Sequence, residues 1–146
     1  MAIDIDEVAR RCICLHTRMA ARAVTRAYNA ALKGIGVEVT EFTLLAALSA
    51  DEAPSISVLA EELAFERTTL VRNLKALVEK GLVEPRKGAG RAMRHVVTAA
   101  GRQLIDAGLP LWEATQSRLE GALEDREDWT ATRRKLRAIR KAAAGS

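Results

Sequence analysis

Apolar residues recur at the spacing of a helix over residues 6–33, a stretch that contains neither Pro nor Gly. The stripe that they form consists of Val8, Cys12, Leu15, Met19, Ala23, Ala27 and Ala30. This pattern predicts one long first helix, which Gly34 and Gly36 end. Since small Ala side chains let a second helix approach closely, we expect this helix to pack against a partner subunit. A long helix that packs only within its own chain is the alternative.

A helix that begins near Thr40, a good N-cap residue, is predicted next, and its core positions are Phe42, Leu45 and Leu48. After a break at residues 51–54, Ser55 or Ser57 caps a short helix that reaches residue 63. Ala64 and Phe65 form a turn, and a longer helix over 66–80 follows.

The helix over 66–80 is amphipathic. Its apolar side, which we expect to be buried, consists of Leu70, Leu74, Leu77 and Val78. Its other side is basic and polar, and the positions that we assign to it are Arg67, Thr68, Thr69, Val71, Arg72, Asn73 and Lys75. A short helix, a turn and a longer helix with a basic outer face are typical of a helix-turn-helix unit.

Two short strands, 82–86 and 94–98, are predicted after Gly81, which stands in the usual position just past a helix end. Residues 87–90 form the tip between them, and Pro85 is acceptable because a two-stranded hairpin has only edge strands. The basic residues of this hairpin are Arg86, Lys87, Arg91 and Arg94. A basic hairpin directly after a helix-turn-helix predicts a wing.

Helical spacing resumes at residue 99 and continues through Pro110, which we expect to kink the helix rather than end it. An acidic break at residues 124–128 precedes a last helix over 129–141. The predicted fold is therefore mainly α with a small β-wing, in a single domain that spans residues 1–146. Within it, residues 40–98 form the winged helix-turn-helix DNA-binding unit, and residues 6–36 and 99–143 form N- and C-terminal dimerisation helices.

Composition supports a globular, helix-rich chain, because 49% of the residues are hydrophobic, 29% are charged and only 3% are aromatic. No apolar run approaches the roughly 20 residues of a membrane span, and the N-terminus lacks the apolar region of a secretory signal. We therefore expect a cytoplasmic protein without a membrane contact. The net charge of +4 is concentrated: residues 63–98 hold eight basic and three acidic residues, a net of +5.

Concentrated positive charge on one unit predicts a polyanion partner, and the winged unit predicts double-stranded DNA. Arg side chains pair with guanine, Asn with adenine, and the methyl groups of Thr and Val contact thymine. The basic residues of the wing would lie near phosphates or the minor groove. The chain has no Gly-rich phosphate loop, no His-Glu-x-x-His and only two histidines, His16 and His95, so we expect no enzyme and no cofactor. A helical protein–protein adaptor that uses the winged fold without DNA is the alternative function.

Two sequence runs add a family resemblance: Leu-x-x-Lys-Gly-Leu-Val, which begins at Leu77, and Val-Thr-x-x-Gly-Arg, which begins at Val97. With the order of elements from Val8 to Arg140, they make the chain resemble the MarR family of bacterial transcriptional regulators. The resemblance implies a homodimer whose terminal helices interlock, a pseudo-palindromic operator and repression that a small ligand or oxidation relieves. In the wing, the Asp-x-Arg of the family is Ala89-Gly90-Arg91 here.

The same resemblance places Cys14 where members that sense organic hydroperoxides keep a reactive cysteine, and Tyr28 where they keep an assisting tyrosine. Arg18 and Val39 stand where those proteins have further tyrosines. Arg10, Arg11 and Arg18 favour a thiolate, with Cys12 as a second candidate thiol. Both cysteines can equally be small apolar residues of a helix seam.

On a continuous helix, Cys12 and Cys14 point about 200° apart and cannot bridge to each other. Cys12 and His16 share a helix face, but two ligands are too few for a tight site, so we expect no metal.

A small effector is the other route to release. Met19, Arg22, Phe42 and Trp112 are candidate lining for a pocket that takes an aromatic acid, because they combine apolar walls with a charge. Each apolar member can equally be a core residue.

Overall fold

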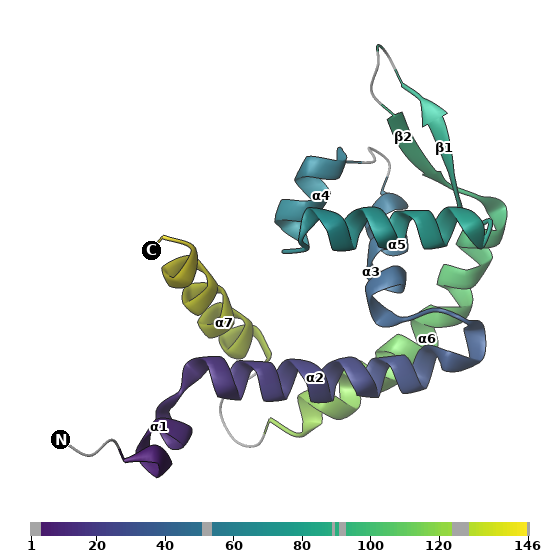
Figure 1. Cartoon of the computed structure of the whole chain (residues 1–146). Helices are drawn as coiled ribbons and strands as arrows, with labels where there is room; N and C mark the ends of the chain where they lie inside the picture. Colours follow the sequence, from purple (N-terminus) through teal and green to yellow (C-terminus); the bar gives the residue numbers. More distant parts are fainter. Residues whose placement is uncertain (1–3, 51–53, 89, 91–92, 124–128, 146) are drawn as a thin grey trace.

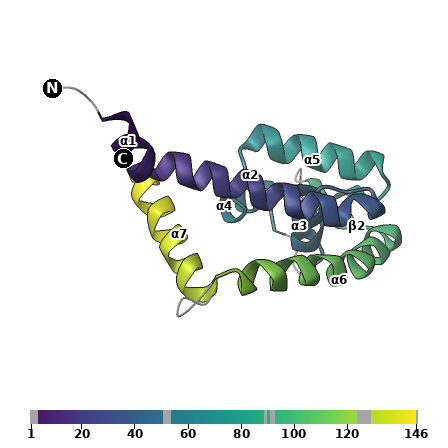
Figure 2. The same cartoon turned by 90° about the horizontal axis from the view of Figure 1, so that it is seen from below.

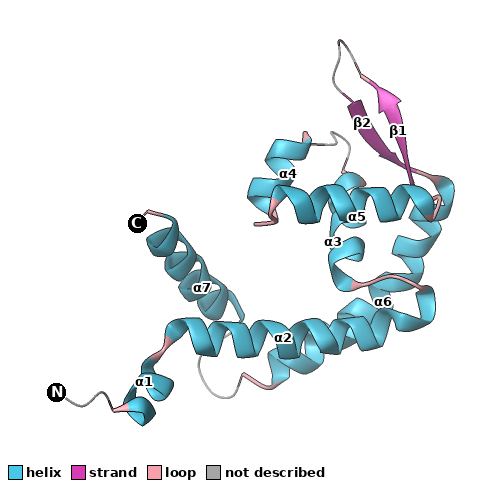
Figure 3. Ribbon diagram, in the orientation of Figure 1, coloured by secondary structure: helices cyan, strands magenta, loops and turns pink. Residues whose placement is uncertain are grey.

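The structure, a computed structural model, describes residues 4–50, 54–88, 90, 93–123 and 129–145. Helices dominate it, and one hairpin projects from the helical body (Figures 1 and 3). The elements in chain order are α1 (Ile5–Arg11), α2 (Ile13–Leu32), the short 3-10 helix η1 (Lys33–Ile35), α3 (Val39–Leu48), α4 (Ile56–Glu62), α5 (Arg67–Glu79), β1 (Val83–Lys87), β2 (Met93–Val97), α6 (Ala99–Gly121) and α7 (Trp129–Ala144). The predicted mainly α fold with a small β-wing is confirmed.

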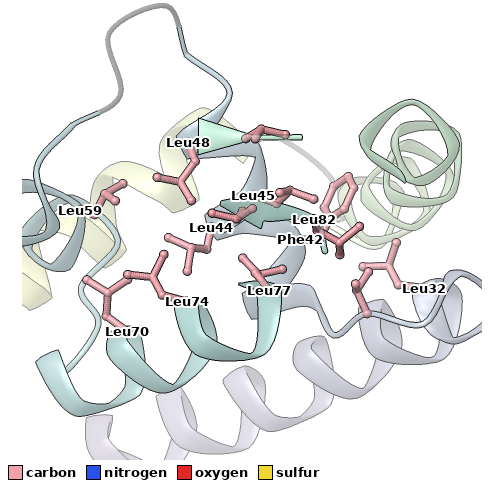
Figure 4. Packing of buried hydrophobic residues seen from close by; sticks show 13 residues of the cluster. Leu32, Phe42, Leu44, Leu45, Leu48, Leu59, Leu70, Leu74, Leu77 and Leu82 are labelled. Carbon is pink, nitrogen blue, oxygen red and sulfur yellow. The ribbon is translucent and has the colours of Figure 1, made fainter. Parts of the chain in front are cut away.

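Helix α3 lies at the centre, where it contacts α2, α5, α6 and β2. It is apolar around most of its circumference, and its residues Phe42, Leu44, Leu45 and Leu48 are all buried. The core that forms around it is rich in leucine (Figure 4). Burying each such side chain stabilises the fold by roughly 1.5–3 kcal/mol, so this cluster is the main support for the elements around it.

The apolar side predicted for the helix over 66–80, which is α5, is largely correct. Leu70, Leu74 and Leu77 are buried against α3, while Val78 is partly buried at the edge of the cluster. This packing fixes which side of α5 faces outward.

The hairpin is antiparallel, and Val83 pairs with Val97, Pro85 with His95, and Lys87 with Met93. Its base is tied to α5 and α6. Thr98 caps α6 by accepting from the Gly101 amide at 3.1 Å, and its hydroxyl donates to the Gly81 carbonyl at 2.7 Å. The wing is therefore anchored to the end of α5 and the start of α6.

The first helix is not continuous, which corrects the prediction of one helix over residues 6–33. Cys12 has an extended backbone (φ −68°, ψ 104°) that separates α1 from α2, and its Sγ accepts the Leu15 amide at 3.4 Å. The apolar stripe could not reveal this break, because changing the ψ of one residue leaves the helical spacing on either side intact.

Other boundaries also differ from prediction. Helix α3 is capped by Glu38 rather than Thr40, because the Glu41 carboxylate accepts the Glu38 amide at 3.0 Å. Helix α6 continues through Pro110, as expected. Helix α7 extends to Ala144, beyond the predicted end at residue 141, and lies at a sharp angle to α6 (Figure 2). The acidic break at residues 124–128 lies outside the described residues. No helix of the described chain has the length and hydropathy to cross a membrane.

Candidate nucleic-acid interface

The turn between α4 and α5 determines how α5 is presented. Ser55 caps α4 by accepting the Val58 amide at 3.3 Å, and the Phe65 amide donates to the Ala60 carbonyl at 2.9 Å. Ala64 has a φ of 52°, in the left-handed region that side chains rarely adopt. This tight reversal places α5 across the end of α4, as in a helix-turn-helix.

The outward side of α5 carries the predicted basic and polar residues, with one exception described below. Arg67, Thr68, Val71, Arg72 and Lys75 are exposed, and Thr69 is half-buried. In the described part of the chain neither Arg67 nor Arg72 forms an ion pair with a carboxylate, and Lys75 lies 3.9 Å from Glu79. Both guanidinium groups are thus available to bases or phosphates without first breaking an ion pair.

Asn73 is the exception, because it is buried, with an exposed fraction of only 9%. It lies three residues after Leu70 and four before Leu77, which places it on the core side of α5. Its Nδ2 has no hydrogen-bond partner among the described residues. The structure therefore places Asn73 on the core side of α5, and not on the outer side where pairing with adenine was predicted.

The wing presents a second exposed basic surface. Arg86, Lys87 and Arg94 are exposed, and Arg86 stands opposite Arg94 in the register of the two strands. The Arg86 Nε also donates to Glu84 at 2.9 Å, so part of its charge is already neutralised within its own strand. Arg91, the remaining wing residue of the prediction, lies outside the described residues.

The candidate redox residues are not brought together within one chain. Cys14 is exposed and Cys12 half-buried, and both are free thiols. Tyr28 follows Cys14 by fourteen residues on α2, a separation of about 21 Å along the helix axis. Tyr28 is buried instead among α6 residues, where its hydroxyl donates to Gln116 and its ring stacks on Trp112 at 6.4 Å between centroids.

Charges around these residues differ from the prediction as well. Burial raises the pKa of Tyr28, and the carboxylates of Glu120 and Glu113 raise it further. Of the arginines predicted to favour a thiolate, Arg11 donates to Glu7 at 2.7 Å and Arg10 lies 3.9 Å from Asp4. The Asp4 and Glu7 carboxylates thus neutralise part of the positive charge near the cysteines.

The residues predicted to line an effector pocket are likewise not brought together within one chain. Phe42 is 3% exposed and packs against Gly108, where an added Cβ would lie 2.4 Å from its ring, so it belongs to the core. Trp112 is half-buried against Tyr28, whereas Met19 is 57% exposed and Arg22 is also exposed. Within one chain, Met19 and Arg22 thus lie on the outside of α2 and Phe42 in the interior.

Sequence reasoning missed a different cavity of about 410 Å³ at the corner between α2, α3 and the end of α5. Its lining residues are Asn29, Ala30, Lys33, Gly36, Val37, Glu38, Glu41 and Lys80. The signal that the sequence offers is Lys80, which stands within one of the two family-like runs, but there it looks like any other cation of the basic stretch 63–98.

Comparison with known proteins agrees with this geometry. The family model described as "MarR family" matches residues 35–92. The crystal structure of the M. tuberculosis transcriptional regulator MosR is similar, with 34% identity, a TM-score of 0.83, and coverage of 94% of this chain and 99% of that one. MosR in complex with DNA is similar at 35% identity, with a TM-score of 0.81 and coverage of 92% and 98%.

A third structure shares the fold at lower identity. CouR from Rhodococcus jostii RHA1, bound to p-coumaroyl-CoA, has 21% identity, a TM-score of 0.71, and coverage of 92% of this chain and 93% of that chain. A comparison with curated proteins gave no match.

The fold and its two exposed basic surfaces define a winged helix-turn-helix protein that binds DNA and regulates transcription, rather than an enzyme. More particularly, the chain belongs to the MarR family of transcriptional regulators.

Proposed function

We propose that this regulator is a homodimeric, cytoplasmic repressor that reads a pseudo-palindromic operator in double-stranded DNA. The observation that carries the proposal is the outward side of α5, where Arg67 and Arg72 stand exposed without a carboxylate partner in the described chain. Two α5 helices related by a twofold axis would enter successive major grooves about 34 Å apart. Arg86, Lys87 and Arg94 of the wing would add sequence-independent contacts to phosphates. Arg91 remains a predicted member of this set.

Unpartnered apolar side chains on the terminal helices support the dimer. Ile5 (72% exposed), Ile13 (58%) and Met19 (57%) are on α1 and α2, and Leu109 (48%) and Leu136 (44%) are on α6 and α7. A second copy would remove these side chains from water at roughly 25 cal/mol per Å² of buried apolar area.

Oxidation of Cys14 is the first candidate trigger for release. An exposed thiolate attacks an organic hydroperoxide, its O–O bond breaks, the alcohol leaves, and a sulfenic acid forms on Cys14. The Cys12 thiol then attacks the sulfur of this sulfenic acid, water leaves, and a Cys12–Cys14 disulfide forms. The angle of about 200° between the two side chains applies only to a continuous helix, whereas the backbone of Cys12 is extended. Tyr28 would assist only from the partner chain. Disulfide formation at the start of α2 would distort the dimer surface.

A small aromatic ligand is the second candidate trigger. Support comes from fold relatives, because CouR binds p-coumaroyl-CoA and the M. tuberculosis protein Rv2887 is in complex with p-aminosalicylic acid. Across a dimer interface, Met19 and Arg22 of α2 would be the exposed residues available to such a ligand.

Fluorescence anisotropy tests the proposal, with a labelled duplex selected from a randomised pool and with a random duplex, over a range of salt. We expect tight, salt-dependent binding to the selected duplex and weak binding to the random one. Equal affinity for both would refute sequence-specific repression and favour the adaptor. Release by cumene hydroperoxide that dithiothreitol reverses, and that Cys14→Ser abolishes, would support oxidation. Insensitivity of the wild type to hydroperoxide leaves the aromatic ligand as the trigger.

A further inference from the structure

An ion pair links the end of the DNA-reading helix to the corner between α2 and α3. The Lys80 ammonium donates to both oxygens of Glu41, at 2.8 and 2.9 Å, and to the Gly36 carbonyl at 3.1 Å. Glu41 is buried, with an exposed side-chain fraction of 8%, whereas that of Lys80 is 39%. This pair connects residues 39 positions apart in the sequence.

A lysine has three N–H bonds and no acceptor, and these contacts engage the ammonium group with one carboxylate and one carbonyl. The Glu41 carboxylate therefore already balances the charge of Lys80, although the sequence places it in the basic stretch 63–98. Lys75, earlier on α5, differs in this respect, because it is exposed and lies 3.9 Å from the Glu79 carboxylate.

The corner that receives Lys80 is itself attached to α2. The Asn29 side chain accepts the Val39 amide at 2.8 Å, and Glu41 accepts the amide of Glu38 at 3.0 Å. A continuous series of polar contacts thus runs from the end of α5, through the start of α3, to α2. Helix α2 in turn carries the exposed apolar side chains assigned above to the dimer.

We propose that Lys80 and Glu41 are positioning residues, which fix the direction of α5 relative to α2 and so the spacing of the two reading helices in the dimer. The inference rests on the proposed function, because only a twofold pair of helices on a defined operator requires one fixed spacing. A change in the direction of α5 would lower the affinity for the operator, because both reading helices must enter their grooves together. It would change the affinity for random DNA little, because phosphate contacts dominate there.

The test compares Lys80→Met/Glu41→Gln with Lys75→Met, by anisotropy on the selected and random duplexes over a range of salt. The double variant removes both charges at once and so avoids a buried, unpaired carboxylate, and the amide oxygen introduced at position 41 can still accept the Glu38 amide. We expect it to lose at least tenfold in affinity for the selected duplex, to stay within twofold on random DNA, and to keep the salt slope of the wild type.

Two single variants serve as controls. Lys75→Met should weaken binding to both duplexes and, if it removes one phosphate interaction, lower the salt slope by about 0.9. Lys80→Arg, which can pair with both oxygens of Glu41, should retain discrimination between the duplexes.

Two results would overturn the inference. A salt slope for Lys80→Met/Glu41→Gln that falls as far as that of Lys75→Met would make Lys80 a phosphate contact. Unchanged affinity for the selected duplex, in a variant whose thermal unfolding midpoint is lowered, would make the pair a stabilising contact only. Failure of the proposed function is distinguishable, because it would appear in the wild type as equal binding to both duplexes, before any variant is compared.

Discussion

His95 lies half-buried in the middle of β2, opposite Pro85 in the hairpin. Burial lowers the pKa of its imidazole from the usual 6.5, because desolvation disfavours the charged form. Well above pH 6.5 the imidazole is neutral in both the folded and the unfolded chain, and it adds no pH dependence there. As the pH falls below 6.5, the unfolded chain binds the proton more readily, so the free energy of unfolding decreases.

We therefore predict that His95→Gln reduces the loss of stability on acidification. Urea unfolding at about pH 7.5 and about pH 5.5 measures this, and the difference in the free energy of unfolding should be smaller in the variant than in the wild type. His16→Gln is the matched control, since His16 is exposed on α2. An equal pH dependence in wild type and His95→Gln would contradict the assignment.

Asn73 shows what sequence reasoning cannot resolve at this scale. A polar residue type favoured the outer side of α5, but position 73 lies within about one turn of both Leu70 and Leu77, and its amide is buried. Residue type and helical position indicate opposite sides of the helix, and the packing against α3 decides between them. Conversely, Arg72 and Lys75 could be predicted correctly as exposed, because both lie away from that apolar side, and Arg67 is exposed at the first residue of α5.

At the scale of elements, the two family-like runs meet at the base of the wing. Gly101, from the second run, packs so closely on the first that an added Cβ would lie 2.3 Å from the Leu82 carbonyl oxygen and 2.7 Å from Val97 Cγ1. No rotamer change can relieve the first of these contacts, because the Leu82 oxygen belongs to the backbone. Gly101 is thus needed for the close approach of α6 to Leu82, the residue before β1, and to Val97 of β2.

We predict that Gly101→Ala destabilises the fold by more than about 1 kcal/mol, since a backbone segment must move to admit the methyl group. Gly34→Ala is the control, because nothing lies within 4 Å of its added Cβ and its backbone conformation suits any residue. Thermal unfolding of both variants checks this. Equal midpoints for the two would show that α6 can move away from the wing without loss.

Most elements could be predicted from the sequence, because long helices and a short hairpin leave clear periodic patterns. Two features could not. The break at Cys12 depends on one backbone angle, and the Lys80–Glu41 pair joins segments whose proximity exists only in the folded chain. The candidate site divides in the same way: its exposed basic residues follow from periodicity, whereas the cavity at the α2–α3 corner depends on tertiary contacts.

At the scale of the whole molecule, the terminal helices carry large apolar side chains that remain exposed to solvent in the single chain. We predict that Met19→Glu converts the dimer to a monomer without a loss of helix content, because Met19 is 57% exposed in the single chain and would face a second copy in the dimer. Sedimentation velocity with circular dichroism measures both quantities. Val58→Glu, on α4 and 41% exposed, is the control that should remain dimeric. A wild-type monomer, or a dimeric Met19→Glu, would refute this interface.

The central claim is that the outward side of α5 reads DNA sequence, and two neighbouring residues test it most directly. The measurement is the ratio of affinities for the selected and random duplexes in Arg72→Ala and in Asn73→Ala. Because Arg72 is exposed and Asn73 faces the core, Arg72→Ala should reduce discrimination by about 1–3 kcal/mol, and Asn73→Ala should leave it within about twofold of the wild type. Loss of discrimination in Asn73→Ala with none in Arg72→Ala would contradict the orientation of α5 and the account built on it.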